Sequence, residues 1–194
     1  MKRMLILLVT ILLLFWVGTA AAVTLSLEPA FQNVEVGGTA SVDLNISGLG
    51  DFAPASLGAF SLDLGYDSSI LGFDSVSFGP YLGDETLFEA DNYFDDSIPG
   101  SVYLDSVSFL FDFELDALQP GSFTLATLTF SALQVGWSDL TMDNVVLSDA
   151  FGYSFNDVTV NNAAVAPVPE PSTWLLMAMG LVGLIGARRK FVKS

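Results

Sequence analysis

The chain of 194 residues has no cysteine and no histidine, and its six basic residues all lie near the two ends. These are Lys2, Arg3, Arg188, Arg189, Lys190 and Lys193. Residues 23–167 contain 21 aspartates and glutamates, the total of 22 less Glu170, with no lysine or arginine. This stretch therefore carries a side-chain charge near −21 at neutral pH, and it has no positive side chain to offset it.

These absences exclude most catalytic chemistry from residues 23–167. Without histidine or lysine there is no ordinary base to activate a serine, and without cysteine there is no thiol nucleophile or usual zinc site. Without a cation there is no clamp for phosphate, and nucleic acid would be repelled. What remains is carboxylate chemistry, either a paired-acid glycosidase or a site for a hard cation.

Acidic pairs such as Asp84-Glu85 and Asp95-Asp96 show no sign of the burial that glycoside hydrolysis requires. We therefore predict that the chain is not an enzyme and that its acids form a solvated surface. The densest run of oxygen ligands is Asp91-Asn92-Tyr93-Phe94-Asp95-Asp96, which lacks the glycine and glutamate of an EF-hand loop. Asp91, Asp95 and Asp96 are candidate calcium ligands, and no other cofactor is expected.

The first 22 residues have the order of a secretory signal. Lys2 and Arg3 precede an apolar run from Leu5 to Val17, and Ala20-Ala21-Ala22 offers small residues for cleavage. A retained first membrane helix is the alternative, but the run is shorter than the ~20 residues of a span. We predict a signal peptide over 1–22 and a mature chain that begins at Val23.

The other end has a proline motif, an apolar run and a basic stop. The apolar run Trp174–Ala187 would cover about 21 Å as a helix, less than a hydrocarbon core of ~30 Å. The basic residues that follow it favour a cytoplasmic end. A buried core helix is the alternative. We predict a single C-terminal transmembrane helix, with residues 23 to about 171 outside the inner membrane.

This tail resembles the PEP-CTERM sorting signal of Gram-negative bacteria over residues 168–192. The motif is Val168, Pro169, Glu170, Pro171 and Ser172, and the basic stop is Arg188, Arg189 and Lys190. The resemblance implies recognition by an exosortase, a membrane-embedded transpeptidase-like enzyme with a cysteine nucleophile. It further implies removal of the tail, after transient anchoring, and delivery to the cell surface or to an exopolysaccharide matrix.

Between the two ends the apolar residues recur with a period of two. Val42, Leu44 and Ile46 alternate with polar residues, and so do the apolar residues of 60–66 and 101–105. Ser122–Ala132 is apolar on both phases, which indicates a strand covered on both sides or one with a bulge near Thr127. No convincing amphipathic helix precedes residue 172.

Turn signals such as Gly37-Gly38, Gly79-Pro80 and Pro120-Gly121 separate these runs at intervals of roughly ten residues. Many short strands with frequent turns predict an all-β sandwich. We expect one domain over 23–160 and a proline-bearing linker over 161–167.

The order of features resembles a cohesin, the jelly-roll module that binds dockerins and shares its fold with some carbohydrate-binding modules. The resemblance is carried by the following segments: Val36-Gly37-Gly38-Thr39, residues 57–67, Gly79-Pro80-Tyr81-Leu82, residues 99–102 and residues 121–130. It implies a cohesin-like jelly-roll sandwich, and it transfers no binding residue to a numbered position.

Three functions follow as alternatives. The first is a non-enzymatic surface module that binds a dockerin-like protein or matrix. The second is a carbohydrate-binding module that uses exposed aromatic rings on exopolysaccharide, with Trp137, Tyr93 and Tyr81 as candidates. The third is a carboxylate-only hydrolase. A flat mixed sheet face would favour the first, a coplanar aromatic strip the second, and a cleft with two buried acids the third.

Overall fold

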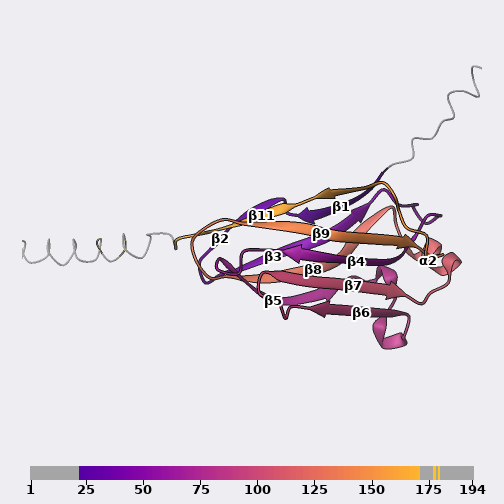
Figure 1. The fold of residues 1–194 in the computed structure, drawn as a ribbon, viewed down its shortest axis with the longest axis horizontal. Helices are drawn as coiled ribbons and strands as arrows, with labels where there is room; N and C mark the ends of the chain where they lie inside the picture. Colours follow the sequence, from indigo (N-terminus) through magenta and orange to yellow (C-terminus); the bar gives the residue numbers. More distant parts are fainter. Residues whose placement is uncertain (1–21, 171–176, 178, 180–194) are drawn as a thin grey trace, which may run out of the picture.

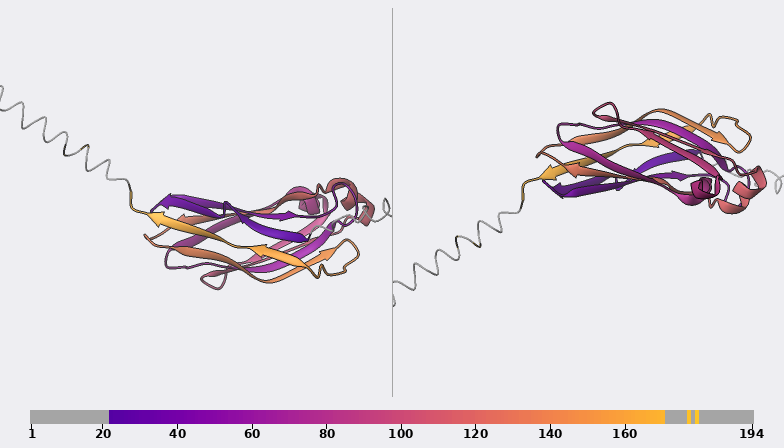
Figure 2. Two further views of the ribbon diagram at one scale, coloured as in Figure 1. Left: turned by 90° about the horizontal axis from the view of Figure 1, so that it is seen from above. Right: turned by 90° about the horizontal axis from the view of Figure 1, so that it is seen from below.

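The computed structural model describes residues 22–170 together with Met177 and Met179. Eleven strands in this part of the chain form two sheets that pack face to face, as Figures 1 and 2 show. The predicted all-β sandwich is therefore confirmed.

The first sheet has five strands in the order β10-β1-β3-β8-β5. Their bounds are Val158–Asn161 for β10, Val23–Glu28 for β1, Thr39–Ser47 for β3, Ser122–Ala132 for β8 and Leu71–Phe78 for β5. The bulge in β8 is at Leu125, because the register with β3 passes from Ala126 directly to Thr124. It lies two residues before the position expected from the sequence, and β8 alternates between buried and half-buried positions on either side of it.

The second sheet has six strands in the order β2-β11-β9-β4-β7-β6. Their bounds are Phe31–Glu35 for β2, Ala163–Val168 for β11, Ser138–Asp149 for β9, Leu57–Gly65 for β4, Ser101–Ser108 for β7 and Ala90–Asp95 for β6. The first two strands pair with the last two, since β1 runs parallel to β10 and β2 runs parallel to β11, while the chain enters and leaves the sandwich at opposite ends of its long axis (Figure 1).

The expected linker over residues 161–167 is wrong. Residues 163–168 form β11, which pairs with both β2 and β9, and the side chains of residues 163–167 are buried. Pro167 fits in this strand although it has no N–H to donate, since its carbonyl still accepts a hydrogen bond from Gly136. The folded domain therefore extends to Val168 and not to residue 160.

The core lies between the sheets and consists of the inward residues that the two-residue period selects. Leu25, Leu44 and Ile46 of the five-stranded sheet meet Leu62, Leu64 and Leu104 of the other, and all six are fully buried. Two phenylalanines, Phe60 and Phe130, add the largest buried side chains.

Three short helical segments connect the strands, and they were not expected from the periodicity. The 3-10 helices η1 (Pro80–Leu82) and η2 (Glu85–Leu87) separate β5 from β6, and the α-helix α2 (Asp112–Leu118) separates β7 from β8. The Phe111 N–H donates to Glu114 Oε2 at 2.9 Å, which satisfies the start of α2. With seven residues and Leu115 as its buried residue, α2 is too short to show a helical period.

The predicted signal peptide lies outside the described residues except for Ala22, and the predicted membrane helix does so except for Met177 and Met179. These two methionines have helical backbone conformation. Within the part of the chain that the structure describes, no helix combines the length and the apolar character that crossing a membrane requires.

Candidate functional site: the sorting segment and the two sheet faces

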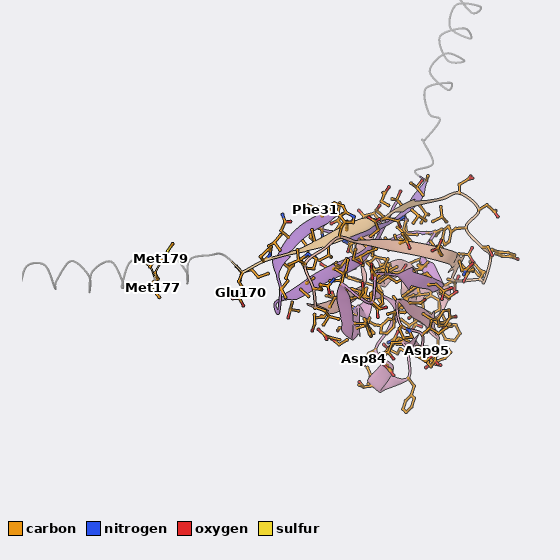
Figure 3. All side chains as sticks on the ribbon, turned by 60° about the vertical axis from the view of Figure 1, so that its left-hand side comes forward. Phe31, Asp84, Asp95, Glu170, Met177 and Met179 are labelled. Carbon is orange, nitrogen blue, oxygen red and sulfur yellow. The ribbon has the colours of Figure 1, made fainter. Side chains whose placement is uncertain are left out.

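The predicted sorting motif begins at Val168, the last residue of β11, so no spacer separates it from the sandwich. The carbonyl of Val168, the last strand residue, accepts a hydrogen bond from the Val36 N–H at 3.0 Å. Pro169 and Glu170 come next and are exposed, and Figure 3 shows Glu170 beyond the end of the sandwich. The rest of the motif, Pro171 and Ser172, and the basic stop at 188–190 lie outside the described residues. The first part of the motif is thus accessible at the rim of the folded domain.

Trp137 helps to hold this last strand in the sheet. Its ring stacks on Phe31 of β2, with centroids 5.1 Å apart and 20° between the planes, and its Nε1–H donates to Asp139 at 2.7 Å. β11 lies between β2 and β9, and its outward residues Ala164 and Ala166 are buried. The register puts Phe31, Ala164 and Asp139 on the same face, so the stacked rings bridge over β11. Trp137 is 55% exposed, but one face of its ring is occupied by Phe31.

The other two aromatic candidates differ from each other. Tyr81 in η1 is half-buried, and its ring packs on Phe123 at a centroid distance of 4.8 Å. Tyr93 of β6 is 54% exposed and lies 6.3 Å from Tyr103 with the rings tilted by 58°. The structure does not bring Trp137, Tyr93 and Tyr81 together into one coplanar strip, so the arrangement expected of a carbohydrate platform is not present among these three.

Tyr93 belongs to a broad surface that we call the six-strand face, the outward side of β6, β7, β4 and β9. Its side chains come from Asp91, Tyr93 and Asp95; Tyr103, Asp105 and Val107; Ala59, Ser61 and Asp63; and Asp139, Thr141, Asp143 and Val146. Val107 and Val146 are exposed apolar residues on it. This face therefore mixes carboxylates with tyrosine and valine.

Tyr103 lies at the centre of the six-strand face. Its register partners are Asp63 on one side and Asp95 on the other, and its hydroxyl donates to Asp105 Oδ2 at 3.1 Å. Burial, the hydrogen bond to Asp105 and the neighbouring negative charges raise the pKa of the Tyr103 hydroxyl above its usual value. Tyr103 is therefore a fixed, neutral ring among carboxylates.

The outward side of the five-stranded sheet, the five-strand face, is arranged differently. Thr124 donates to Asn45 at 2.6 Å, Thr127 donates to Asp43 at 2.6 Å, and Ser131 donates to both oxygens of Asp74 at 2.6 and 2.8 Å. Each of these bonds joins neighbouring strands, so the polar groups on this face satisfy one another.

The candidate calcium ligands do not converge. Asp91 and Asp95 share one side of β6, and Asp95 Oδ1 accepts from the Ser97 N–H at 2.9 Å. Hydrogen bonds from the backbone and side chain of Ser97 lower the pKa of Asp95. Within the residues that the structure describes, no three aspartates or glutamates come close enough to hold a metal ion. Calcium binding at Asp91, Asp95 and Asp96 stays a prediction with no cluster to support it.

A glycosidase pair has no counterpart in the described residues either. The buried polar side chains there are Ser56, Ser106, Gln119 and Ser138, and none of them is a carboxylate. Asp67 and Asp84, like Asp95, have pKa values lowered by hydrogen bonds from a nearby serine or threonine. A general acid needs the opposite shift.

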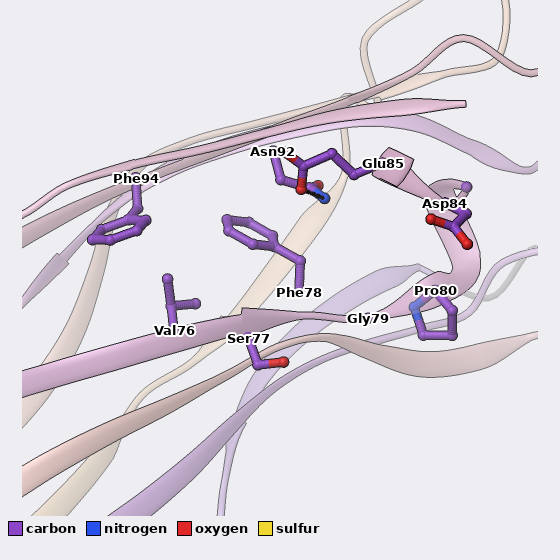
Figure 4. Close-up of a pocket in the computed structure, with 10 residues that line it drawn as sticks. Val76, Ser77, Phe78, Gly79, Pro80, Asp84, Glu85, Asn92 and Phe94 are labelled. Atoms are coloured by element: carbon purple, nitrogen blue, oxygen red, sulfur yellow. Dashed lines mark hydrogen bonds between the residues drawn. The ribbon is translucent and has the colours of Figure 1, made fainter. Parts of the chain in front are cut away.

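A pocket of about 570 Å³ opens along one side of the sandwich, between the edge strands β5 and β6 (Figure 4). Val76 and Phe78 of β5 and Phe94 of β6 form its apolar part. Asn92 lies at its polar end, where its Nδ2 donates to Glu85 Oε2 at 3.4 Å. Asp84 and Glu85 also line the pocket, and both residues are exposed.

Sequence reasoning missed Tyr103, Val107 and Val146 as surface residues of one face. Tyr103 and Val107 follow the alternation of β7, so their outward direction is predictable once the phase of that strand is known. Val146 follows a register shift in β9, which reverses the phase set by Asp139, Thr141 and Asp143. Which strands are neighbours is set by pairing over long sequence distances, and the pattern of one strand does not contain this.

The PEP-CTERM protein-sorting motif matches residues 167–190. No curated protein matches the chain.

Many solved structures share the fold of the sandwich. The seventh ScaB type I cohesin from Pseudobacteroides cellulosolvens is 18% identical with a TM-score of 0.60, over 77% of this chain and 94% of that one. A chain of a type I cohesin–dockerin complex from Clostridium thermocellum is 16% identical with a TM-score of 0.61, over 79% and 98%. A non-cellulosomal cohesin from the archaeon Archaeoglobus fulgidus is 16% identical with a TM-score of 0.56, over 79% and 96%.

Proposed function

From a PEP-CTERM sorting motif carried on a cohesin-like β-sandwich, we propose that the chain is an exported, non-enzymatic binding protein. An exosortase recognises its tail and removes it, and the sandwich then binds a partner at the cell surface or in the extracellular matrix through the six-strand face. A dockerin-like protein is one form of that partner. The PEP-CTERM motif itself indicates an exported protein that is sorted to the cell surface.

The position of the motif supports the sorting step. β11 is anchored on both sides, and Pro169 and Glu170 are exposed directly after it. A processing enzyme can therefore reach the motif while the sandwich stays folded. Because Val168 is the last paired residue, a cut beyond it leaves every strand of both sheets complete.

The sorting step is tested by replacing Pro169-Glu170-Pro171 with three alanines. We expect export to continue and the variant to accumulate in the inner membrane with its tail still attached, as measured by fractionation and by intact mass. Replacing Asn161 with alanine, an exposed residue before β11, serves as the control and should be processed normally. Normal delivery of the triple-alanine variant to the surface would refute the sorting step.

One observation carries the binding role: the six-strand face is mixed in character and presents exposed apolar residues. It presents Tyr93, Val107 and Val146 among carboxylates, whereas the hydroxyls of the five-strand face bond to their own neighbours. Interfaces between proteins favour tyrosine within a polar surround. The alternative, a carbohydrate-binding module, lacks a coplanar strip among its three candidate rings.

The binding role is tested with the full chain in detergent, immobilised and exposed to the secreted proteins and, separately, to the exopolysaccharide of the source organism. The Tyr93→Ser and Val146→Ser double variant should lose the bound protein, and Ser77→Ala on the five-strand face should keep it. If the chain retained polysaccharide but no protein, the carbohydrate-binding module would replace the protein-binding module as the proposed function. Running each arm with and without calcium shows whether Asp91, Asp95 and Asp96 take part.

A further inference from the structure

Eight exposed apolar side chains gather at the end of the sandwich opposite to the end of β11. We call this surface the aromatic end, and it comprises Phe52, Leu87, Phe88, Phe109, Phe111, Phe113, Phe151 and Tyr153. Each is at least 61% exposed, and Phe88 is 86% exposed. Figure 1 shows α2, which bears Phe113, at one end of the long axis, with β11 pointing toward the other.

The strand register places these segments together. β4 begins where β9 ends, since Leu57 pairs with Asp149, and β6 begins where β7 ends, since Ala90 pairs with Ser108. The loops that carry the eight residues all leave from these strand ends. Direct bonds join them further, from the Phe109 N–H to the Glu89 carbonyl at 2.7 Å and from the Phe52 N–H to the Gln119 carbonyl at 3.0 Å.

Ring stacking and hydrogen bonds within the loops hold these aromatic residues in place. Phe111 and Phe113 stack with centroids 5.7 Å apart and 8° between the planes. Asp149 Oδ1 accepts from the N–H groups of both Phe151 and Tyr153 at 2.9 Å. The loops therefore present these rings in defined positions.

Two of the phenylalanines have a backbone conformation that a bulky residue normally avoids. Phe52 has φ 54° and Phe88 has φ 60°, in the left-handed region where glycine would be free of strain. Neither ring joins the core, and an exposed phenylalanine gives the fold nothing in return for that strain. A strained backbone at two exposed phenylalanines that do not contribute to the core points to a binding role for these rings.

The negative charge of the aromatic end indicates which kind of partner can bind there. The loops that carry the rings also carry carboxylates, namely Asp51, Glu85, Glu89, Asp112, Asp116 and Asp149, and residues 22–170 contain no lysine, arginine or histidine. A second copy of the chain, an anionic lipid surface or a nucleic acid would be repelled by these charges. Arginine and lysine fit both components, since they bind carboxylates by charge-assisted hydrogen bonds and bind ring faces by cation–π contacts.

We propose that the aromatic end is a second binding surface, distinct from the six-strand face, for a basic segment of a partner protein in which arginine or lysine alternates with apolar residues. The sorting segment leaves from the opposite end, so this surface points away from whatever holds the tail. Eight exposed apolar side chains gathered on one surface are typical of an interaction site.

The test uses the full chain in detergent and a synthetic peptide in which arginine alternates with leucine. Binding is measured by calorimetry for wild type, for the triple variant Phe88→Ser, Phe111→Ser and Phe113→Ser, and for Tyr93→Ser on the six-strand face. We expect the triple variant to bind about tenfold more weakly or worse. Tyr93→Ser should bind like wild type, and circular dichroism checks that every variant is folded.

A second pair of probes separates the two components. A peptide alternating arginine with serine tests the apolar part, and one alternating glutamate with leucine tests the charge; both should bind at least about tenfold more weakly than the arginine–leucine peptide. The proposal is overturned if the triple variant binds like wild type, if Tyr93→Ser weakens binding equally, or if the glutamate–leucine peptide binds as well. None of these results depends on whether the six-strand face binds its own partner.

Discussion

The five-strand face and the six-strand face are built on the same alternation and cover the same core, yet their outward residues behave differently. On the five-strand face Thr124, Thr127 and Ser131 donate to acceptors on the next strand. On the six-strand face one such bond, from Asn144 Nδ2 to Asp63 Oδ2 at 2.7 Å, joins β9 to β4, and the other carboxylates lie beside tyrosine and valine. The difference shows that a solvent-facing position can be used to lock strands together or left available for a partner, with no change in the fold beneath it.

The largest effect is expected where the two sheets are equivalent, in the core. Phe130 of β8 and Phe60 of β4 are both essentially buried, so either change to alanine should remove about 3–5 kcal/mol from the free energy of unfolding. Urea unfolding followed by circular dichroism measures this. If one of the two were nearly neutral, the sheets would not be equally packed and the comparison of their faces would lose its basis.

A somewhat smaller effect is expected at Gln119, the residue that joins the start of β4 to η1. The buried Gln119 amide accepts from the Leu57 N–H at 2.7 Å and donates to the Leu57 and Tyr81 carbonyls at 2.8 and 2.9 Å. Gln119→Ala leaves these groups without a partner and should cost about 2–4 kcal/mol. The exposed Gln134→Ala should stay within about 0.5 kcal/mol. Equal losses for the two variants would contradict this account.

A matched pair of threonine-to-valine substitutions, one on each face, compares the two faces. Thr127→Val removes the hydroxyl that donates to Asp43 and should cost about 1 kcal/mol. Thr141→Val on the six-strand face should change the unfolding free energy by less than about 0.5 kcal/mol. The same urea titrations measure both. A larger loss at Thr141 than at Thr127 would reverse the distinction between a locked and an open face.

The smallest effect concerns pH and Tyr103. Its pKa is raised above the usual 10.0, so folding favours the neutral hydroxyl. The contribution of the neutral Tyr103 hydroxyl to the free energy of unfolding is fully present below the usual pKa. It is lost as the pH rises through the higher pKa of the folded state. Tyr103→Phe should therefore lessen the fall in Tm above pH ~10 relative to wild type. Parallel Tm curves for the two proteins would show that Tyr103 ionisation contributes nothing.

Much of the fold followed from a two-residue period that begins and ends at visible turns. The β8 strand was predicted with its observed bounds because an apolar run of strand length follows the Pro120-Gly121 turn signal, and the alternation of Val42, Leu44 and Ile46 lies within β3. β11 was missed because its sequence, Ala-Ala-Val-Ala-Pro-Val, has no alternation and contains a proline. Its burial depends on Trp137 and Phe31, which are distant in sequence and cover its small side chains.

The candidate site was less accessible to sequence reasoning, for a related reason. The sorting motif is a contiguous signal, so it was found with its residues and order. The six-strand face depends on the pairing of β6, β7, β4 and β9, and the aromatic end depends on loops that only the register brings to one end. Tyr81 and Trp137 were predicted as exposed rings that could stack on a polysaccharide, yet packing on Phe123 and Phe31 gives each a structural contact.

The parallel pairing of β2 with β11 has a mechanical consequence. β11 runs toward the sorting segment, and β2 and β9 flank it on either side. A pull between the tail and the aromatic end would act along the strand axis, so the hydrogen bonds of both ladders would bear the load together in shear instead of opening one after another. We therefore expect the sandwich to resist mechanical extension along its long axis while its two ends are held.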